Sequence, residues 1–82
     1  MELRDRFAIN LRKARQKQGI SQEALAGLCD LHRTEISLLE RGGREPRLGT
    51  IAKLAAALDC SPEELCAGIR WNTKTGKFTF KK

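Results

Sequence analysis

The segment from Ile20 to Gly42 constrains the fold of this chain more than any other, because its pattern indicates two short helices joined by a tight turn. Ser21 is placed to cap the first helix, over about residues 22–29, and apolar or small residues follow it at helical spacing. Asp30 stands where the chain must turn, and aspartate adopts left-handed backbone more readily than most residues, at some cost in strain. We therefore expect a helix, a tight turn and a second helix here.

The second helix is expected over about residues 33–41. Ile36 and Leu39 are three residues apart, so both face the core, and Leu31 fills the turn before them. The outward face of this helix is then polar. It consists of Arg33, Thr34 and Ser37.

Three further helices are expected around this segment. Apolar residues recur at helical spacing over about residues 3–17, and Gly19 ends that helix. Ser61 and Pro62 mark the start of the fifth helix, as a cap followed by proline in the first turn. The fourth helix has an apolar face that consists of Leu48, Ile51, Leu54, Ala55 and Leu58. The sequence thus predicts an all-α, five-helix domain over residues 1–67.

Residues 68–82 change from helical periodicity to alternation, which predicts a short C-terminal β-hairpin with a turn near Gly76. An isolated two-stranded ribbon is marginal in water, so its apolar face must cover something. Three interpretations stand: the hairpin packs on its own domain, it contributes to a dimer, or the segment is a disordered basic tail. In a dimer, Leu65 of the fifth helix is the rival contact. The apolar residues of the hairpin are Ile69, Trp71, Phe78 and Phe80.

Length and composition exclude several classes of protein. A chain of 82 residues buries a small core, so a partner subunit would add useful stability. No run approaches the roughly 20 apolar residues of a membrane span, and the charged N-terminus lacks a signal-peptide core. We expect a cytoplasmic protein without membrane contact, small-molecule substrate or cofactor.

The cysteines do not form a metal or disulfide pattern. Cys29, Cys60 and Cys66 are odd in number and lack the Cys-x-x-Cys spacing, and His32 is the only histidine. We expect no metal site and three reduced thiols in or near the core.

The net charge of +6 is concentrated at the C-terminal end. Residues 1–64 hold eleven Lys and Arg against ten acids, whereas residues 65–82 hold five basic residues and no acid. A positive charge alone is weak evidence for nucleic acid, because many small proteins are basic. The five basic residues are Arg70, Lys74, Lys77, Lys81 and Lys82.

Several spaced motifs give a resemblance that covers about residues 3–66. They are Leu-Arg-Lys-Ala-Arg, Ser-Gln-Glu-x-Leu-Ala, Ile-Ser-x-x-Glu-Arg-Gly, Arg-Glu-Pro-Arg-Leu-x-Thr-Ile and Ala-Leu-Asp-Cys-Ser-Pro-Glu-Glu-Leu. In this order they resemble the phage repressor/Cro-like, XRE-type helix-turn-helix transcriptional regulators, which have a lambda-repressor-like fold. The segment from Leu31 to Ser37 is also similar to that of restriction–modification controller proteins, a small dimeric branch of this family.

The resemblance implies that the helix beginning at Arg33 reads bases in the major groove of double-stranded DNA. Arginine matches guanine O6 and N7, and a threonine methyl or hydroxyl can meet a thymine methyl or a base edge, which suits Thr34. Ser37 lies one turn further on the same face. Leu38 either contacts a thymine methyl or packs locally.

Other residues are expected to hold phosphates. Family members use a glutamine at the position of Gln22 to bind a phosphate oxygen, which sets register without reading sequence. Arg41 and Arg44 lie in the loop after the reading helix and can hold flanking phosphates. Arg47 either helps them or caps the next helix.

Two acidic residues have separate roles. The resemblance implies that Arg15 pairs with Glu40, which ties the first helix to the third. Glu35 is an acid in the reading helix, where it would repel phosphate. It either meets a cytosine N4 amine or pairs with Arg33 or Arg44.

The leading hypothesis is a sequence-specific DNA-binding transcriptional regulator, such as a repressor, that binds a palindromic operator as a homodimer. The alternative is a protein-interaction module, such as an antitoxin or adaptor, that uses its aromatic hairpin. The polar face of the third helix favours DNA, because an adaptor would not need it. An enzyme is a poor third possibility, since no partnered nucleophile or carboxylate cluster is present.

Overall fold

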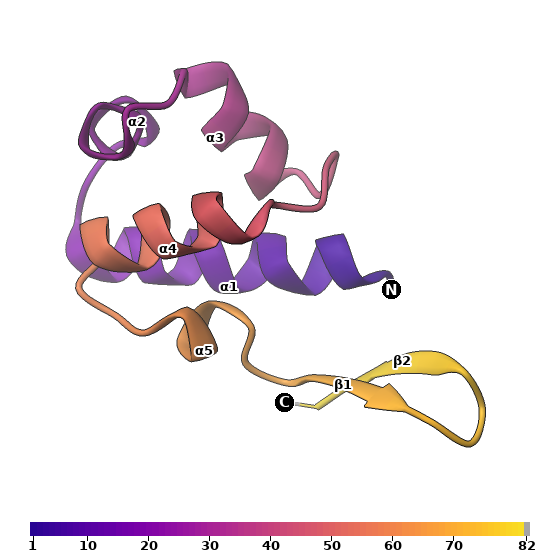
Figure 1. Cartoon of the computed structure of the whole chain (residues 1–82). Helices are drawn as coiled ribbons and strands as arrows, with labels where there is room; N and C mark the ends of the chain where they lie inside the picture. The colour runs from indigo at the N-terminus through magenta and orange to yellow at the C-terminus, as the bar shows by residue number, and fades with distance from the viewer. Residues whose placement is uncertain (82) are drawn as a thin grey trace.

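The computed structural model describes residues 1–81 and contains five helices followed by a two-stranded antiparallel hairpin (Figure 1). This confirms the predicted all-α, five-helix fold with a C-terminal hairpin. No helix within the described residues is both long enough and apolar enough to cross a membrane. The elements are α1 (Leu3–Gln18), α2 (Gln22–Cys29), α3 (Arg33–Glu40), α4 (Leu48–Ala57), α5 (Pro62–Leu65), β1 (Ile69–Asn72) and β2 (Lys77–Phe80).

The ends of α2 follow the local signals of the sequence. The Ser21 hydroxyl accepts a hydrogen bond from the backbone N–H of Ala24, which caps the helix. Asp30 ends α2 in the left-handed region with φ 54°, as expected for the tight turn. The α3 helix ends at Glu40, one residue earlier than expected, because Arg41 occupies its C-cap position.

The core lies between α1 and α4 on one side and the α2–α3 pair on the other (Figure 1). Leu48 corrects one expectation, because it is 81% exposed and takes no part in the buried face of α4. It occupies the first position of α4, and its neighbours Arg47 and Gly49 are exposed as well. The largest fully buried side chains are Leu11, Leu25, Ile36, Leu39, Leu54, Leu58 and Leu65.

The prediction that Leu65 contacts a partner subunit is wrong, because its side chain is fully buried in its own domain. Helix α5 has only four residues and packs against α1 and α4. Asn10 of α1 reinforces this packing, since its Nδ2 donates to the carbonyl oxygen of Leu65 at 3.0 Å. The only apolar side chain that α5 directs inward is therefore used within the protomer.

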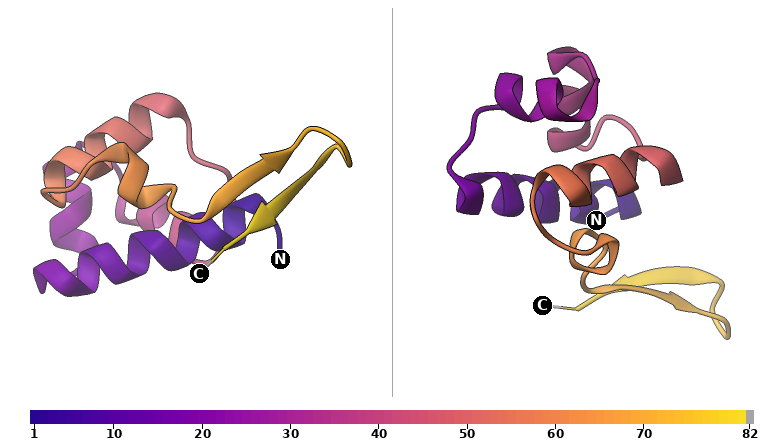
Figure 2. Two further views of the ribbon diagram at one scale, coloured as in Figure 1. Left: turned by 90° about the horizontal axis from the view of Figure 1, so that it is seen from below. Right: turned by 60° about the vertical axis from the view of Figure 1, so that its left-hand side comes forward.

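The hairpin extends away from the helical body (Figures 1 and 2), and the molecule measures 41 × 21 × 19 Å. Ile69 and Phe80, at the base of the hairpin, are half-buried. Trp71 and Phe78 lie further out, and 55% and 43% of their surfaces remain exposed. The base of the hairpin thus packs on its own domain, whereas its outer aromatic residues do not.

Candidate nucleic-acid interface

The surface of α3 is divided as its sequence predicts. Ile36 and Leu39 are fully buried, and Arg33 and Thr34 are exposed in the first turn. Ser37 is half-buried. The helix therefore has two anchored apolar positions and a polar first turn that faces solvent.

Leu38 is half-buried and packs against the loop that follows α3. A Cβ atom at Gly43 would lie 2.5 Å from the Leu38 Cδ1 atom, so the leucine side chain covers this glycine. A larger residue at position 43 would displace it. This contact favours local packing over base contact for Leu38.

Glu35 pairs with Arg44, whose Nη1 lies 2.7 Å from its Oε1. Of the partners expected for Glu35, Arg44 is the one that the structure brings close. Arg41 donates from Nε to the Ser37 carbonyl oxygen at 3.3 Å. Arg47 occupies the N-cap position of α4, but its side chain makes no capping hydrogen bond and is exposed. Three arginines therefore follow α3 at the surface, one of them already paired.

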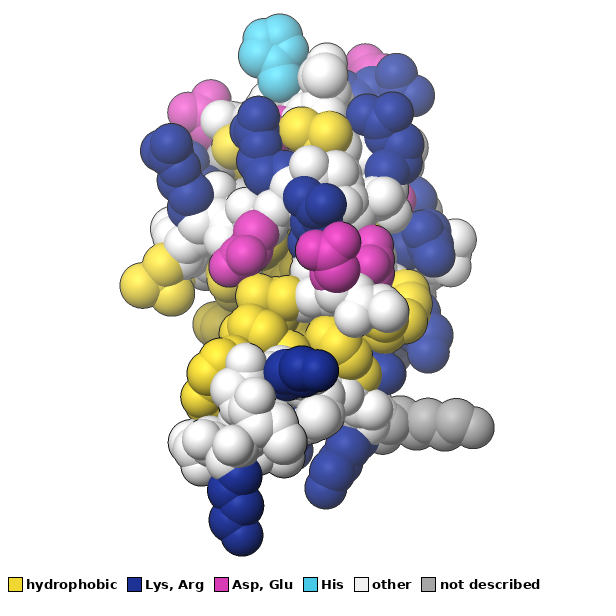
Figure 3. All heavy atoms as spheres, turned by 90° about the vertical axis from the view of Figure 1, so that its right-hand side faces the viewer, with side chains coloured by type: hydrophobic (Ala, Val, Ile, Leu, Met, Phe, Trp, Pro, Cys, Tyr) yellow, Lys and Arg dark blue, Asp and Glu magenta, His cyan; other side chains and the backbone are white. Residues whose placement is uncertain are grey.

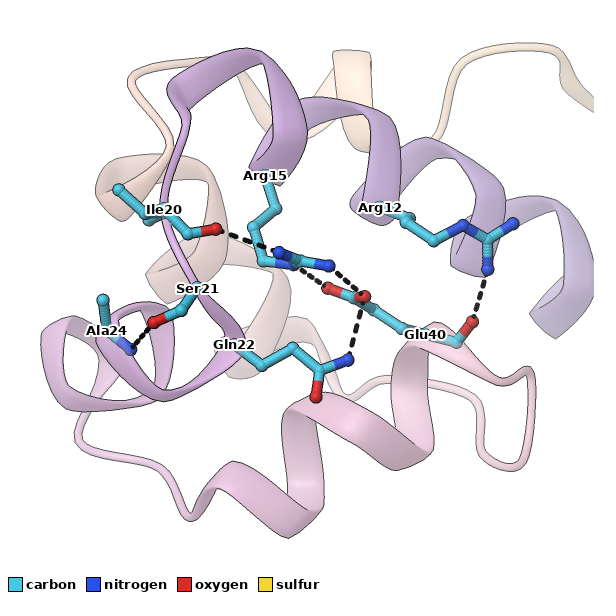
Figure 4. A network of polar contacts seen from close by, with 7 residues as sticks. All are labelled: Arg12, Arg15, Ile20, Ser21, Gln22, Ala24 and Glu40. Atoms are coloured by element: carbon cyan, nitrogen blue, oxygen red, sulfur yellow. Dashed lines mark hydrogen bonds and ion pairs between the residues drawn. The ribbon is translucent and has the colours of Figure 1, made fainter.

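A buried ion pair connects α1 to α3 (Figure 4). Glu40 is only 3% exposed and accepts hydrogen bonds from Arg15 Nε at 2.6 Å and Nη2 at 2.9 Å. Hydrogen bonding to Glu40 raises the pKa of the Arg15 guanidinium above its ordinary value. Arg15 also donates from Nη1 to the Ile20 carbonyl oxygen at 2.9 Å. The pairing that the family resemblance implied is thus present.

Gln22 joins the same network, because its Nε2 donates to Glu40 Oε1 at 3.1 Å (Figure 4). One of its two amide N–H groups is therefore engaged within the protein. Arg12 adds a further link from α1, since its Nη1 donates to the Glu40 carbonyl oxygen at 3.0 Å. Sequence reasoning missed both contacts. The position of Arg12, one helical turn before Arg15, was the signal available for its contact.

The cysteines lie in or near the core, as expected, and all three are free. Burial raises the pKa of each thiol, and at Cys60 the neighbouring Glu64 raises it further. Cys29 donates its S–H to the Lys53 carbonyl oxygen at 3.5 Å. Within residues 1–81, no three His, Cys, Asp or Glu side chains are grouped so that they could hold a metal ion.

Comparison with known proteins identifies the family to which this arrangement of α2 and α3 belongs. Residues 11–65 match the family described as Helix-turn-helix. The chain belongs to the helix-turn-helix family.

Named relatives of this helix-turn-helix protein include control proteins. It is 47% identical over 60 residues to control protein C.BamHI of Bacillus amyloliquefaciens, covering 72% of this chain and 74% of the relative. The restriction-modification controller protein C.AhdI of Aeromonas hydrophila has a TM-score of 0.73 and 45% identity, covering 76% of this chain and 94% of that chain. The P22 c2 repressor, solved in complex with a synthetic operator, has a TM-score of 0.70 and 34% identity. The match covers 76% of this chain and 94% of the repressor chain.

These similarities confirm the leading hypothesis in its general form: this helix-turn-helix protein is a DNA-binding transcriptional regulator. The family is not a class of enzymes. The similarities do not favour the alternative of an antitoxin or adaptor module. The individual DNA contacts of Arg33, Thr34 and the phosphate-binding residues stay predictions.

Proposed function

We propose that the protein is a homodimer that binds a two-fold symmetric operator in the cytoplasm, with α3 of each protomer in the major groove. The observation that supports this most directly is the division of α3. Arg33 and Thr34 are exposed in its first turn, while Ile36 and Leu39 are fully buried. A helix held in this way presents its N-terminal side chains to base edges without moving.

In this proposal Arg33 and Thr34 read bases. A guanidinium is a rigid fork that donates two parallel hydrogen bonds to guanine O6 and N7. Thr34 meets the adjacent base through its methyl or hydroxyl group, and Ser37, one turn further on, meets a base or a phosphate. Leu38 contributes packing against Gly43 rather than sequence recognition.

Gln22, Arg41, Arg44 and Arg47 hold phosphates on either side of the read bases. Such contacts set the register of the protein on the duplex without reading its sequence. Gln22 is well suited to this role, because its bond to Glu40 fixes the direction of its amide. The same network ties α1, α2 and α3 together, so the reading helix and its phosphate contacts form one rigid unit.

A dimer is required because one reading helix covers too few base pairs for useful specificity. Two helices in successive major grooves lie about 34 Å apart, which places half-site centres about 10 base pairs apart. The relatives C.BamHI and C.AhdI are named as control proteins, the latter of restriction-modification. We therefore propose that this chain regulates restriction-modification genes. Residues 1–67 bind DNA, and residues 68–82 form a separate functional segment.

The test starts with selection of bound sequences from a random DNA pool, which should yield inverted repeats of this spacing. Arg33→Ala should cost about 1–3 kcal/mol on the selected site and remove the preference at one base pair. Arg44→Ala should weaken binding to all sequences alike and reduce the salt slope by about one. An unchanged base preference in Arg33→Ala would reject its assigned role, and an asymmetric site bound by a monomer would reject the dimer.

A further inference from the structure

The hairpin has one aromatic face and one polar face. Ile69 pairs with Phe80 across the strands and Trp71 pairs with Phe78, so these four side chains share a face. Trp71 and Phe78 contact each other edge to face, with ring centroids 5.0 Å apart. Both are among the exposed large hydrophobic residues of the molecule. The free protomer therefore leaves an aromatic pair in water.

The hairpin is held firmly at its base. Arg6 of α1 donates hydrogen bonds to the carbonyl oxygens of Ala67 and Lys81, and its guanidinium carbon lies 5.8 Å from the centre of the Phe80 ring. The backbone N–H of Lys81 donates to the Gly68 carbonyl oxygen at 2.8 Å. Residues 68–81 therefore form an ordered hairpin that extends in a fixed direction. This excludes the interpretation of the segment as a disordered tail.

The aromatic face continues into an apolar groove on the helical body. Ile69 at the base of the hairpin lines this groove, and Figure 3 shows a band of hydrophobic side chains between the hairpin and the body. Leu48, at the start of α4, is the most exposed large hydrophobic residue. The other residues that line the groove are Leu3, Phe7, Glu45, Pro46, Ile51 and Cys66.

Opposite charges flank this surface. Every ionisable residue of the segment 65–82 other than Cys66 is basic. On the body, exposed Glu45 lines the groove, and Glu2 and Asp5 lie at the start of α1, beside the groove residue Leu3. Figure 3 shows acidic side chains gathered beside the hydrophobic band. The hairpin is thus basic, and three acids lie along the rim of the groove, of which Glu2 is paired with exposed Arg4 at 3.6 Å.

We propose that a second copy of this chain covers this surface, with the basic hairpin of each protomer lying over the acidic rim and apolar groove of the other. A two-fold contact presents the same surface on both protomers, so it must be complementary to itself. Charges of opposite sign at its two ends, with an apolar centre, satisfy that requirement. Trp71 and Phe78 of each protomer then pack near Leu48 of its partner.

The position of the hairpin favours a second protein chain over DNA. The hairpin lies on the opposite side of the α1–α4 layer from α2 and α3 (Figures 1 and 2), so its lysines do not face the duplex that α3 enters. The groove lies between the hairpin and the helical body, on the face that Figure 3 shows. A two-fold axis beside that face, parallel to the direction from the hairpin to α3, would leave both α3 helices pointing in one direction. The inference rests on the proposed homodimer and assigns its contact surface.

The first experiment measures dimer dissociation by sedimentation and by the fluorescence of Trp71, the only tryptophan of the chain. Dilution of the wild-type protein should dissociate it and shift the emission to longer wavelength as Trp71 becomes hydrated. Phe78→Ser and Leu48→Ser should each raise the dissociation constant at least about tenfold. Leu28→Ser removes another exposed leucine, on α2, and should change it less than about twofold. Circular dichroism checks that every variant is folded.

The second experiment exchanges charges. Glu45→Lys makes the groove rim basic, and Lys74→Glu with Lys77→Glu makes the hairpin acidic. Each variant alone should dimerise about tenfold more weakly, whereas an equimolar mixture should form a heterodimer with near wild-type affinity. In that heterodimer both hairpin-to-rim contacts again join opposite charges.

The outcomes separate this inference from the proposed function. A wild-type protein that is monomeric both free and on DNA overturns the homodimer and this surface together. A wild-type dimer that Phe78→Ser, Leu48→Ser and the charge exchanges leave unchanged overturns only the surface. Loss of DNA affinity in the hairpin variants, with dimerisation intact, would assign the hairpin to DNA instead.

Discussion

The carboxylate of Glu40, the last residue of α3, is held by both Nε and Nη2 of Arg15 in α1, at 2.6 and 2.9 Å. Glu40 is 3% exposed, and its Oε1 also accepts a hydrogen bond from Gln22 in α2. Three helices therefore meet at one buried carboxylate. The orientation of the reading helix depends on this contact as well as on its apolar packing.

Removal of one partner of this pair should destabilise the fold strongly. Glu40→Ala leaves the Arg15 guanidinium without its anion, and we expect the free energy of unfolding to fall by about 3 kcal/mol. Urea unfolding followed by circular dichroism measures the change. The double variant Arg15→Met with Glu40→Leu should recover much of the loss, because no unpaired charge remains. A loss below about 1 kcal/mol in Glu40→Ala would contradict the structural role of the pair.

Glu35 should restrain DNA binding through its pairing with Arg44. Glu35→Gln removes a negative charge near the DNA and frees Arg44, so we expect affinity for unrelated DNA to rise several-fold at low salt. Folding stability should change by less than about 1 kcal/mol, because the pair is partly exposed to solvent. Fluorescence anisotropy across a salt series measures the affinity.

Glu63→Gln removes an exposed acid from α5, outside α3 and outside the groove, and serves as the control for this effect. If Glu35→Gln weakens binding to the selected operator alone, Glu35 contacts a cytosine amine instead of restraining Arg44.

Asp30 should tolerate glycine better than alanine. Its φ of 54° lies in the left-handed region, where a Cβ atom costs energy and aspartate is among the better-tolerated residues. We expect Asp30→Ala to lower the free energy of unfolding by about 1 kcal/mol and Asp30→Gly to leave it within about 0.5 kcal/mol. Thermal unfolding compares the two variants, and equal stability would show that this turn stores no strain.

Buried thiols should make the fold less stable in mild alkali. Burial raises the pKa values of Cys29, Cys60 and Cys66, so the folded protein keeps these protons at a pH where the unfolded chain releases them. The unfolded chain then binds fewer protons, and the free energy of unfolding falls as pH rises above about 8.5. Below that pH the thiols are protonated in both states, so they do not make the free energy of unfolding depend on pH.

Urea unfolding between pH 7 and 9.5 tests this dependence. Cys66→Ala should show a smaller decrease with pH than the wild type, whatever its stability at pH 7. Iodoacetamide should also react slowly with the native thiols at pH 8 and rapidly in urea. If the free energy of unfolding falls equally with pH in Cys66→Ala and in the wild type, the Cys66 thiol does not contribute to the decrease.

Much of the fold could be predicted from the sequence because its signals are local. The α2 helix spans Gln22–Cys29 as expected, since the Ser21 cap and the Asp30 turn each depend on neighbours within one helical turn. The alternation after Gly68 likewise predicted a hairpin, because side chains of a strand alternate between two faces. Arg15 and Glu40 were paired through the family resemblance and not through spacing.

The tertiary structure alone decided which apolar residues are used within the protomer. Leu65 and Leu48 are both leucines at helical positions, yet one is fully buried and the other is 81% exposed. The bond from Gln22 to Glu40 and the anchoring of the hairpin by Arg6 likewise join residues far apart in the chain. Caps, turns and periodicity are interactions between near neighbours and can be read along the chain. Burial and long-range hydrogen bonds depend on how the helices pack, which no local pattern contains.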